Sequence, residues 1–366
     1  MRTNHTRVDA GGVRGVFFPL LILMLLLSGC AGSTPQLKGG DSRELQWPPL
    51  PVPPRITWVK EIRDFHDVGI SKGFWQRAAE LLTGEPDPRI GKPYGVFVDG
   101  KERLFIADVG LAVVHVMDLE KKKYSVIGGN NPALRTPIAV TGDDKDNIYI
   151  TDAGAGTIYR YPLSGGSLQP FNVTPLDRPT GIAFNPNNRL IYVSDTVSHQ
   201  VVVFDLSGNE RYRIGGRGTS PGQFNYPTDL FVDAAGRLYV TDALNSRIQI
   251  FSASGTLLRY FGRAGDTVGN FARPKGVAVD SDGHIYVCDA LFDAVQIFND
   301  TGRVLLDFGT HGSNPGQFWM PAGIFIGKKD LIYVADSYNR RVQVFRYLKV
   351  DDPQQGAPAK APGERK

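Results

Sequence analysis

The stretch LYVTDALNSRIQIF at residues 238–251 is written twice more, as IYVCDALFDAVQIF at residues 285–298 and as IYVADSYNRRVQVF at residues 332–345. Each copy holds two short runs of Val, Ile, Tyr and Phe, which favour β-strands, on either side of a turn. The copies begin at residues 238, 285 and 332, a constant interval of 47 residues. Such a period indicates an architecture assembled from similar small units.

A second marker extends the repeat over most of the chain. In six places a Pro is followed, two residues later, by Gly, Ala or in one case Asp: Pro93, Pro137, Pro179, Pro227, Pro274 and Pro321. Each Pro starts a unit with four strand-like runs, as in VAV, IYVCD, AVQIF and VLLDFG between residues 277 and 309. A period in the forties with four strands is typical of a propeller blade, so the sequence predicts an all-β, six-bladed β-propeller.

The repeats resemble those of the NHL-repeat family over about residues 55–348. The segments NSRIQIF and NRRVQVF stand where the naming motif of that family lies. The linker pattern G-x-x-G-x-x-x-G-x-F-x-x-P, a further hallmark of the family, is complete at residues 215–227, 262–274 and 309–321, whereas the first two linkers depart from it. The resemblance implies the same six-bladed propeller that the repeat period predicts.

The sixth repeat stops after its third strand, at residues 341–348. A blade without its outer strand would expose an unpaired sheet edge, which folded proteins avoid. The segment ITWVKEIRDF at residues 56–65 resembles the outer strands of other repeats. We therefore predict that this N-terminal strand completes the last blade and closes the ring.

Outside the repeats, the sequence predicts four further segments. Basic residues and the apolar run VFFPLLILMLLL at residues 16–27 indicate a signal peptide over residues 1–29, and LSGC at residues 27–30 resembles the lipobox of bacterial lipoproteins. Residues 30–54 then read as a lipidated Cys30 and a Pro-rich tether, ahead of the propeller at residues 55–350. A short amphipathic helix is expected at residues 71–84, on the face that carries the loops after the second strands, which we call the top face. Residues 351–366 are expected to be disordered.

These segments imply an exported protein, anchored by lipid to the bacterial envelope. Ala31 after the lipidated Cys points to the outer membrane. The formal net charge is +4, and removing residues 1–29 takes away three Arg and one Asp to leave +2. This balance argues against nucleic acid as a partner, because phosphate recognition needs a concentrated basic face. We expect a monomer.

Six aspartates recur at the end of the second strand of each repeat: Asp108, Asp152, Asp195, Asp242, Asp289 and Asp336. They could form a ring of metal-binding or catalytic carboxylates. A residue that occurs in every blade, however, is expected to stabilise a turn that every blade contains. We therefore expect the six aspartates to accept hydrogen bonds from turn backbone N–H groups. Cys288 lies within a strand and is expected to be a buried, inert thiol.

The channel offers few candidates for chemistry. Enzymes with six-bladed propellers place metal ligands where the inner strands line the channel, but the residues just after each Pro contain no His, Asp or Glu. Asp229 is the exceptional carboxylate there and is a candidate channel residue. His66, His199 and His311 show no metal-binding spacing, so we expect no cofactor, with calcium or zinc as the alternative. The alternative function is a metal-dependent hydrolase, lactonase or lyase of the six-bladed propeller type.

The loops that follow the six aspartates differ from blade to blade, as binding loops do. Arg and aromatic residues are enriched at binding hot spots, and these loops with their adjoining linkers supply candidate contact residues on the top face. The candidates are His199, Asn245, Arg247, Phe292, Tyr338, Arg340, Tyr226, Lys275 and Trp319. The sequence therefore predicts a binding or scaffold protein that recognises an envelope protein, peptide or glycan, with no catalytic residues.

Overall fold

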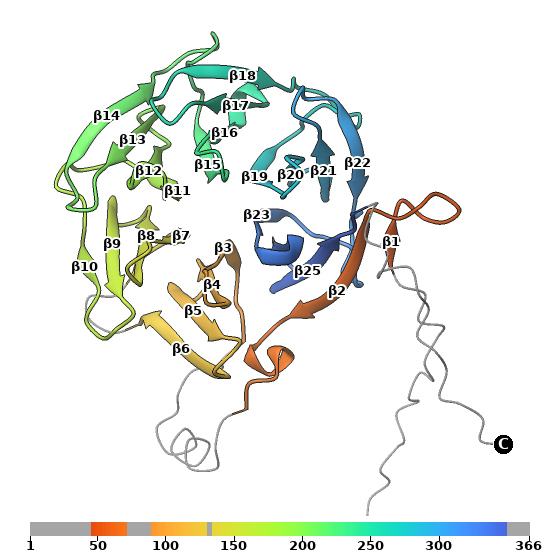
Figure 1. The fold of residues 1–366 in the computed structure, drawn as a ribbon, viewed down its shortest axis with the longest axis horizontal. Coiled ribbons are helices and arrows are strands. Elements are labelled where there is room, and N and C mark those ends of the chain that lie inside the picture. Colours follow the sequence, from red (N-terminus) through yellow and green to blue (C-terminus); the bar gives the residue numbers. More distant parts are fainter. Residues whose placement is uncertain (1–44, 72–88, 130–133, 350–366) are drawn as a thin grey trace, which may run out of the picture. The chain divides into compact units, whose positions relative to one another are not determined.

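The computed structural model describes residues 45–71, 89–129 and 134–349, which form six antiparallel sheets around a central channel (Figure 1). Five of the sheets have four strands each, which follow one another in chain order from the channel outward. The sixth sheet has five strands and takes two of them from the N-terminal part of the chain. The predicted six-bladed β-propeller is confirmed.

Each position in the repeat has its own strand. The inner strands all begin with Pro and are β3 (Pro93–Val98), β7 (Pro137–Gly142), β11 (Pro179–Asn185), β15 (Pro227–Val232), β19 (Pro274–Val279) and β23 (Pro321–Ile326). The second strands all end with Asp and are β4 (Arg103–Asp108), β8 (Asn147–Asp152), β12 (Leu190–Asp195), β16 (Leu238–Asp242), β20 (Ile285–Asp289) and β24 (Leu331–Asp336). The third strands are β5 (Val113–Asp118), β9 (Thr157–Pro162), β13 (Gln200–Phe204), β17 (Arg247–Phe251), β21 (Ala294–Phe298) and β25 (Arg341–Tyr347). The outer strands of the first five blades are β6 (Lys123–Gly128), β10 (Gln169–Pro170), β14 (Glu210–Gly215), β18 (Leu257–Phe261) and β22 (Val304–Phe308).

The burial of the strands explains their composition. Every residue of β17, β20 and β21 is buried, because neighbouring blades pack on both faces of each sheet. The outer strand β22 instead alternates between buried or half-buried and exposed residues, since one of its faces meets solvent. This burial explains why the middle strands of each repeat are apolar and why the outer strand at its end has a mixed sequence.

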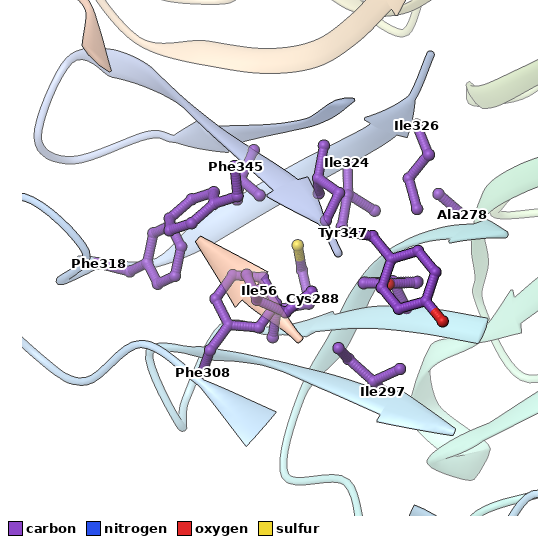
Figure 2. Packing of buried hydrophobic residues seen from close by; sticks show 14 residues of the cluster. Ile56, Ala278, Cys288, Ile297, Phe308, Phe318, Ile324, Ile326, Phe345 and Tyr347 are labelled. Atoms are coloured by element: carbon purple, nitrogen blue, oxygen red, sulfur yellow. The ribbon is translucent and has the colours of Figure 1, made fainter. Parts of the chain in front are cut away.

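The ring closes as predicted. Strand β2 (Ile56–Ile62) pairs antiparallel with β25, from Ile56 opposite Tyr347 to Ile62 opposite Val342, and Figure 1 shows the orange β2 along the blue β25. Ile56 is fully buried, and Figure 2 shows its side chain among the rings of Phe308 and Phe318. The N-terminal strand therefore joins the blade that the C-terminal strands begin.

One short strand lies where we predicted only tether. Strand β1 (Gln46–Trp47) pairs with β2 and adds a fifth strand to the last blade. The Trp47 ring lies 5.8 Å from the rings of both Phe308 and Phe345. The tether prediction for residues 30–54 is therefore wrong for residues 45–54, which belong to the outer edge of the propeller.

The repeated spacing of the three complete linkers has a steric cause. Gly215, Gly262 and Gly309 have φ angles of 83°, 100° and 93°, in the left-handed region that favours glycine. A Cβ atom at Gly215 would lie 2.3 Å from the Phe224 ring, and Gly262 and Gly309 face Phe271 and Phe318 in the same way. Each linker is thus a glycine turn folded over its own buried Phe.

The remaining described elements are the short 3-10 helices η1 (Phe65–Val68), η2 (Ala243–Asn245) and η3 (Lys328–Asp330). Within residues 45–71, 89–129 and 134–349 there is no helix with the length and apolar character that crossing a bilayer requires. The predicted signal peptide, Cys30, residues 72–84 of the predicted helix, and the C-terminal tail lie outside the described residues.

Candidate functional site

The six repeated aspartates organise the top face, which we define as the loops that follow them and the linker residues just before each inner-strand Pro. All six are buried. Asp108 shows the pattern, because it accepts hydrogen bonds from the backbone N–H groups of Gly91, Lys92, Gly110 and Leu111 at 2.6–3.0 Å. The other five each accept at least one N–H group from the residues just before their own Pro. The expected structural role of these carboxylates is confirmed.

Arg247 and Asn245 make hydrogen bonds within the propeller. Arg247 is only 6% exposed, and its guanidinium donates to the Asp242 carboxylate at 2.7 Å and to the carbonyls of Thr219, Ser220 and Gln223 at 2.8–2.9 Å. The Asn245 amide donates to Asp242 and to a linker carbonyl. Burial argues against the predicted contact role of Arg247, whereas Asn245 is half-buried; the hydrogen bonds of both tie the linker to the blade.

The same network is built in the last blade. Arg341 is fully buried and donates to Asp336 at 2.7 Å, to Glu61 of β2 at 2.6 Å, and to three linker carbonyls at 2.8–2.9 Å. Gln343 follows it on β25 and accepts from the Trp58 indole N–H at 3.1 Å. The Arg and Gln of the NHL motif thus hold the linker and, in the last blade, the closing strand.

The other predicted contact residues fall into two groups. His199 is buried: its Nδ1, assigned as the acceptor, receives the Tyr226 N–H at 3.2 Å, which again contradicts a contact role. Phe292 is half-buried. Tyr226, Trp319 and Tyr338 are 39%, 46% and 48% exposed, and Arg340 is also exposed. The exposed group remains available to a partner.

Trp319 and Tyr338 form an exposed aromatic pair. Their ring centroids lie 5.4 Å apart, and the Lys92 Nζ lies 4.7 Å above the Tyr338 ring. The His311 ring centroid lies 6.1 Å from that of Trp319. These contacts hold two large aromatic rings in fixed orientations at the surface, which lowers the entropy cost of binding with them.

A further set of surface residues includes Tyr338 and four residues that the sequence did not single out. Five of the six loops after the aspartates present a large apolar or aromatic side chain, 43–59% exposed, at nearly the same place in the repeat: Leu111, Val197, Leu244, Leu291 and Tyr338. The loop sequences contain these apolar residues, but Leu and Val are common core residues and were not among the predicted contact residues. We call this set the apolar ring.

Basic residues accompany the apolar ring. The linker ends and one loop carry exposed cations that form no ion pair with another described residue: Lys92, Arg135, Arg178, Arg273 and Arg340. By contrast, Asp293 on the same face is paired with His311 at 2.7 Å. With Asp177 as the exposed carboxylate at a linker end, the linker ends and loops of the top face still carry more exposed cations than exposed carboxylates, despite the near-neutral sequence.

The channel below this face has two parts. The upper part is a narrow space of about 20 Å³, where Lys275 donates to the Tyr94 hydroxyl at 3.1 Å and lies 5.0 Å from its ring. Lys275, predicted as a contact residue, is thus half-buried in the channel mouth. The lower part is a cavity of about 210 Å³, whose lining includes Phe97, Phe231 and Phe325.

Asp229 lies where the two parts meet and lines both. The equivalent residue is Gly in four blades, and a Cβ atom on those glycines would lie 2.3–2.6 Å from the next blade. The Asp229 carboxylate accepts the Val277 N–H at 3.1 Å across that same boundary. Burial raises the pKa of Asp229 to about 7, although hydrogen bonds from the Val277 and Leu230 amides act in the opposite direction.

Replacing Asp229 with Asn is expected to stabilise the fold at high pH but not at low pH. Below about pH 4 the acid is protonated in both states; between about pH 4 and 7 only the unfolded state loses the proton, so the folded state becomes less stable as pH rises. Asn does not titrate and avoids this loss, which amounts to at most about 4 kcal/mol. Urea unfolding at about pH 4 and about pH 8 measures the difference, and the same pH profile in both proteins would contradict it.

Among residues 45–71, 89–129 and 134–349, no group of three or more His, Cys, Asp or Glu side chains is close enough to hold a metal ion. His66 pairs with Asp64 and His311 with Asp293, at separate places. Cys288 is fully buried, and burial raises the pKa of its thiol well above the usual range, so it is the inert thiol we expected.

Comparisons with known proteins agree with this architecture. A family model described as the SMP-30/Gluconolactonase/LRE-like region matches residues 152–262, and one described as the NHL repeat matches residues 271–293 and 318–345. No curated protein matches the chain.

Solved structures with low sequence identity share the fold. One is virginiamycin B lyase from Staphylococcus aureus, with 16% identity and a TM-score of 0.53 over 70% of this chain and 95% of that one. Another is an auxiliary nutrient binding protein from Bacteroides thetaiotaomicron, with 17% identity and a TM-score of 0.58 over 71% and 70%. A chain of the nidogen/laminin complex has 17% identity and a TM-score of 0.52 over 67% and 86%. The chain is thus a closed ring of six blades that contains NHL repeats at residues 271–293 and 318–345.

Proposed function

We propose that this protein is a binding or scaffold protein of the bacterial envelope that recognises a protein, peptide or glycan through the top face of its propeller. The observation that carries the proposal is the apolar ring. Its side chains are exposed in five blades, whereas the neighbouring aspartates that every blade needs are buried. We take large apolar side chains that are exposed at the same place in five blades as a candidate interaction surface.

The charges on this face narrow the class of partner. Five exposed cations without ion pairs stand beside the apolar ring. A partner surface with carboxylates around an apolar centre would complement both features, since buried apolar anchors supply most of the affinity and rim charges supply orientation and association rate. An acidic protein or peptide segment fits this description best.

Anchoring completes the proposal. We propose that residues 1–29 are removed, that Cys30 carries lipid, and that the protein is held at the outer membrane. The motif LSGC at residues 27–30 supports this. The fixed inner network around Arg247 and Arg341 makes the propeller a rigid platform, which suits a module that presents loops to a partner.

Replacing Trp319 and Tyr338 together with Ala is expected to reduce partner binding at least tenfold. The two rings form a fixed, exposed pair, and central aromatic residues at interfaces contribute about 2 kcal/mol or more each. The measurement is the amount of each envelope protein captured from extracts by the full-length wild-type and variant proteins, quantified by mass spectrometry.

A matched control replaces Leu258 and Leu305 with Ala, because these residues are about as exposed but lie on the outer strands β18 and β22. Capture should be unchanged in that variant. Equal capture by wild type and the top-face variant would overturn the proposal, and a stoichiometric calcium or zinc ion in the purified protein would favour the hydrolase or lyase alternative.

A further inference from the structure

The lower channel is lined by aromatic rings that the core does not enclose. Phe97 and Phe325 have ring centroids 5.2 Å apart at 73°, and Phe231 lies 6.4 Å from Phe325. Phe residues between the blades, such as Phe271 and Phe318, are fully buried, whereas these three are half-buried. They surround the cavity of about 210 Å³ and leave part of their faces open to it.

A carboxyl group without a cation lies at the upper end of this cavity. Asp229 forms no ion pair with any residue in the described part of the chain. Lys275 also lines the upper channel, but its ammonium group donates to Tyr94. Burying a carboxylate without a partner cation is costly, and the fold itself favours Gly at this position. Packing of the blade therefore does not explain why Asp occupies position 229.

The surroundings define what would complement the group. Aromatic faces attract cations as well as hydrocarbon, and a carboxylate beside them pairs with an ammonium group. A cavity of roughly 150 Å³ is enough to hold benzene, so the larger lower channel can take a ring with a short side chain. We propose that the lower channel binds a small organic ammonium ion, with its nitrogen at Asp229 and its hydrocarbon part against Phe97, Phe231 and Phe325.

The site is separate from the top face. The Lys275–Tyr94 contact and the space of only about 20 Å³ separate the two ends of the channel. Access to the lower cavity is from the opposite face, which carries the turns between the inner and second strands, such as β3 and β4. The inference therefore does not depend on the proposed top-face function.

The test is a titration of the full-length protein with 2-phenylethylammonium chloride by calorimetry at about pH 8. The expected result is saturable binding of one molecule per chain, weakened at least tenfold by Asp229→Asn and by Phe231→Ala. Asn keeps an oxygen that can accept the Val277 N–H, so D229N removes the charge with the least change in packing. The uncharged analogue 2-phenylethanol is expected to bind at least tenfold more weakly than the ammonium ion.

Asp307→Asn is the matched control, because Asp307 is an exposed carboxylate on β22, away from the channel. Its affinity for the ammonium ion should equal that of wild type. The proposal is overturned if wild type does not bind the probe, if D229N binds it as tightly, or if 2-phenylethanol binds equally well. Partner capture through the top face should be unchanged in D229N, so the two proposals can fail independently.

Discussion

Deletion of residues 45–62 is expected to unfold the propeller. This segment contains β1 and β2, and β2 supplies the outer strand that pairs with β25. Ile56 and Ile62 are fully buried, and losing each such side chain costs about 2–5 kcal/mol before the strand hydrogen bonds are counted. The sum approaches the whole stability of a typical domain, about 5–15 kcal/mol. Thermal unfolding followed by circular dichroism is expected to show no cooperative transition, or one lowered by well over ten degrees.

Val59→Ala provides the control, since Val59 lies in the same strand but is exposed at an irregularity of the pairing. Its melting temperature should stay within a few degrees of wild type. A deletion variant that melts as the wild-type protein does would mean that β2 is an accessory strand and that the last blade is stable without it.

Arg341→Met is expected to destabilise the protein by about 3–5 kcal/mol, the cost of removing one partner from a buried ion pair. The guanidinium of Arg341 is fully buried and reaches Asp336, Glu61 and three linker carbonyls. Burial raises the pKa of Asp336 while Arg341 opposes that shift, so removing Arg341 leaves the carboxyl with less compensation. Urea unfolding of the two proteins measures the difference.

The neighbouring residue gives a close control. Arg340 is exposed and forms no ion pair with another described residue, so Arg340→Met should change stability by no more than about 0.5 kcal/mol. Equal effects of the two substitutions would show that the network around Arg341 contributes nothing beyond a surface charge, contrary to its geometry.

The sequence was sufficient to predict the ring and its closure. The Pro that begins each inner strand, the Asp that ends each second strand and the glycine linkers mark local geometry that every blade needs, so they recur at fixed places. The missing fourth strand of the sixth repeat predicted its N-terminal replacement, because an open sheet edge has to be covered.

The sequence was not sufficient where partners lie far apart in the chain. Strand β1 has two residues and no periodicity, and Trp47 is fixed by Phe308 and Phe345, which follow it by 261 and 298 residues. Arg247 was misassigned because composition does not distinguish a buried Arg from an exposed one. Its recurrence as Arg341 was the available signal, since a residue repeated between blades generally serves the fold.

The candidate sites could also be predicted only in part from the sequence. Asp229 could be singled out because it interrupts a series of small residues, but its lack of a cation and the aromatic cavity below it became visible only in the structure. The Leu residues of the apolar ring look like core residues in the sequence. Only their exposure identifies them as surface residues.

Site-specific photo-cross-linking can show whether the top face is the surface that meets a partner. A photoreactive phenylalanine analogue replaces Tyr338 on the top face in one full-length protein and Val126, exposed on β6, in another. After irradiation of intact cells, we expect a discrete cross-linked species from position 338 and none from position 126. A species from position 126 with none from position 338 would contradict that expectation.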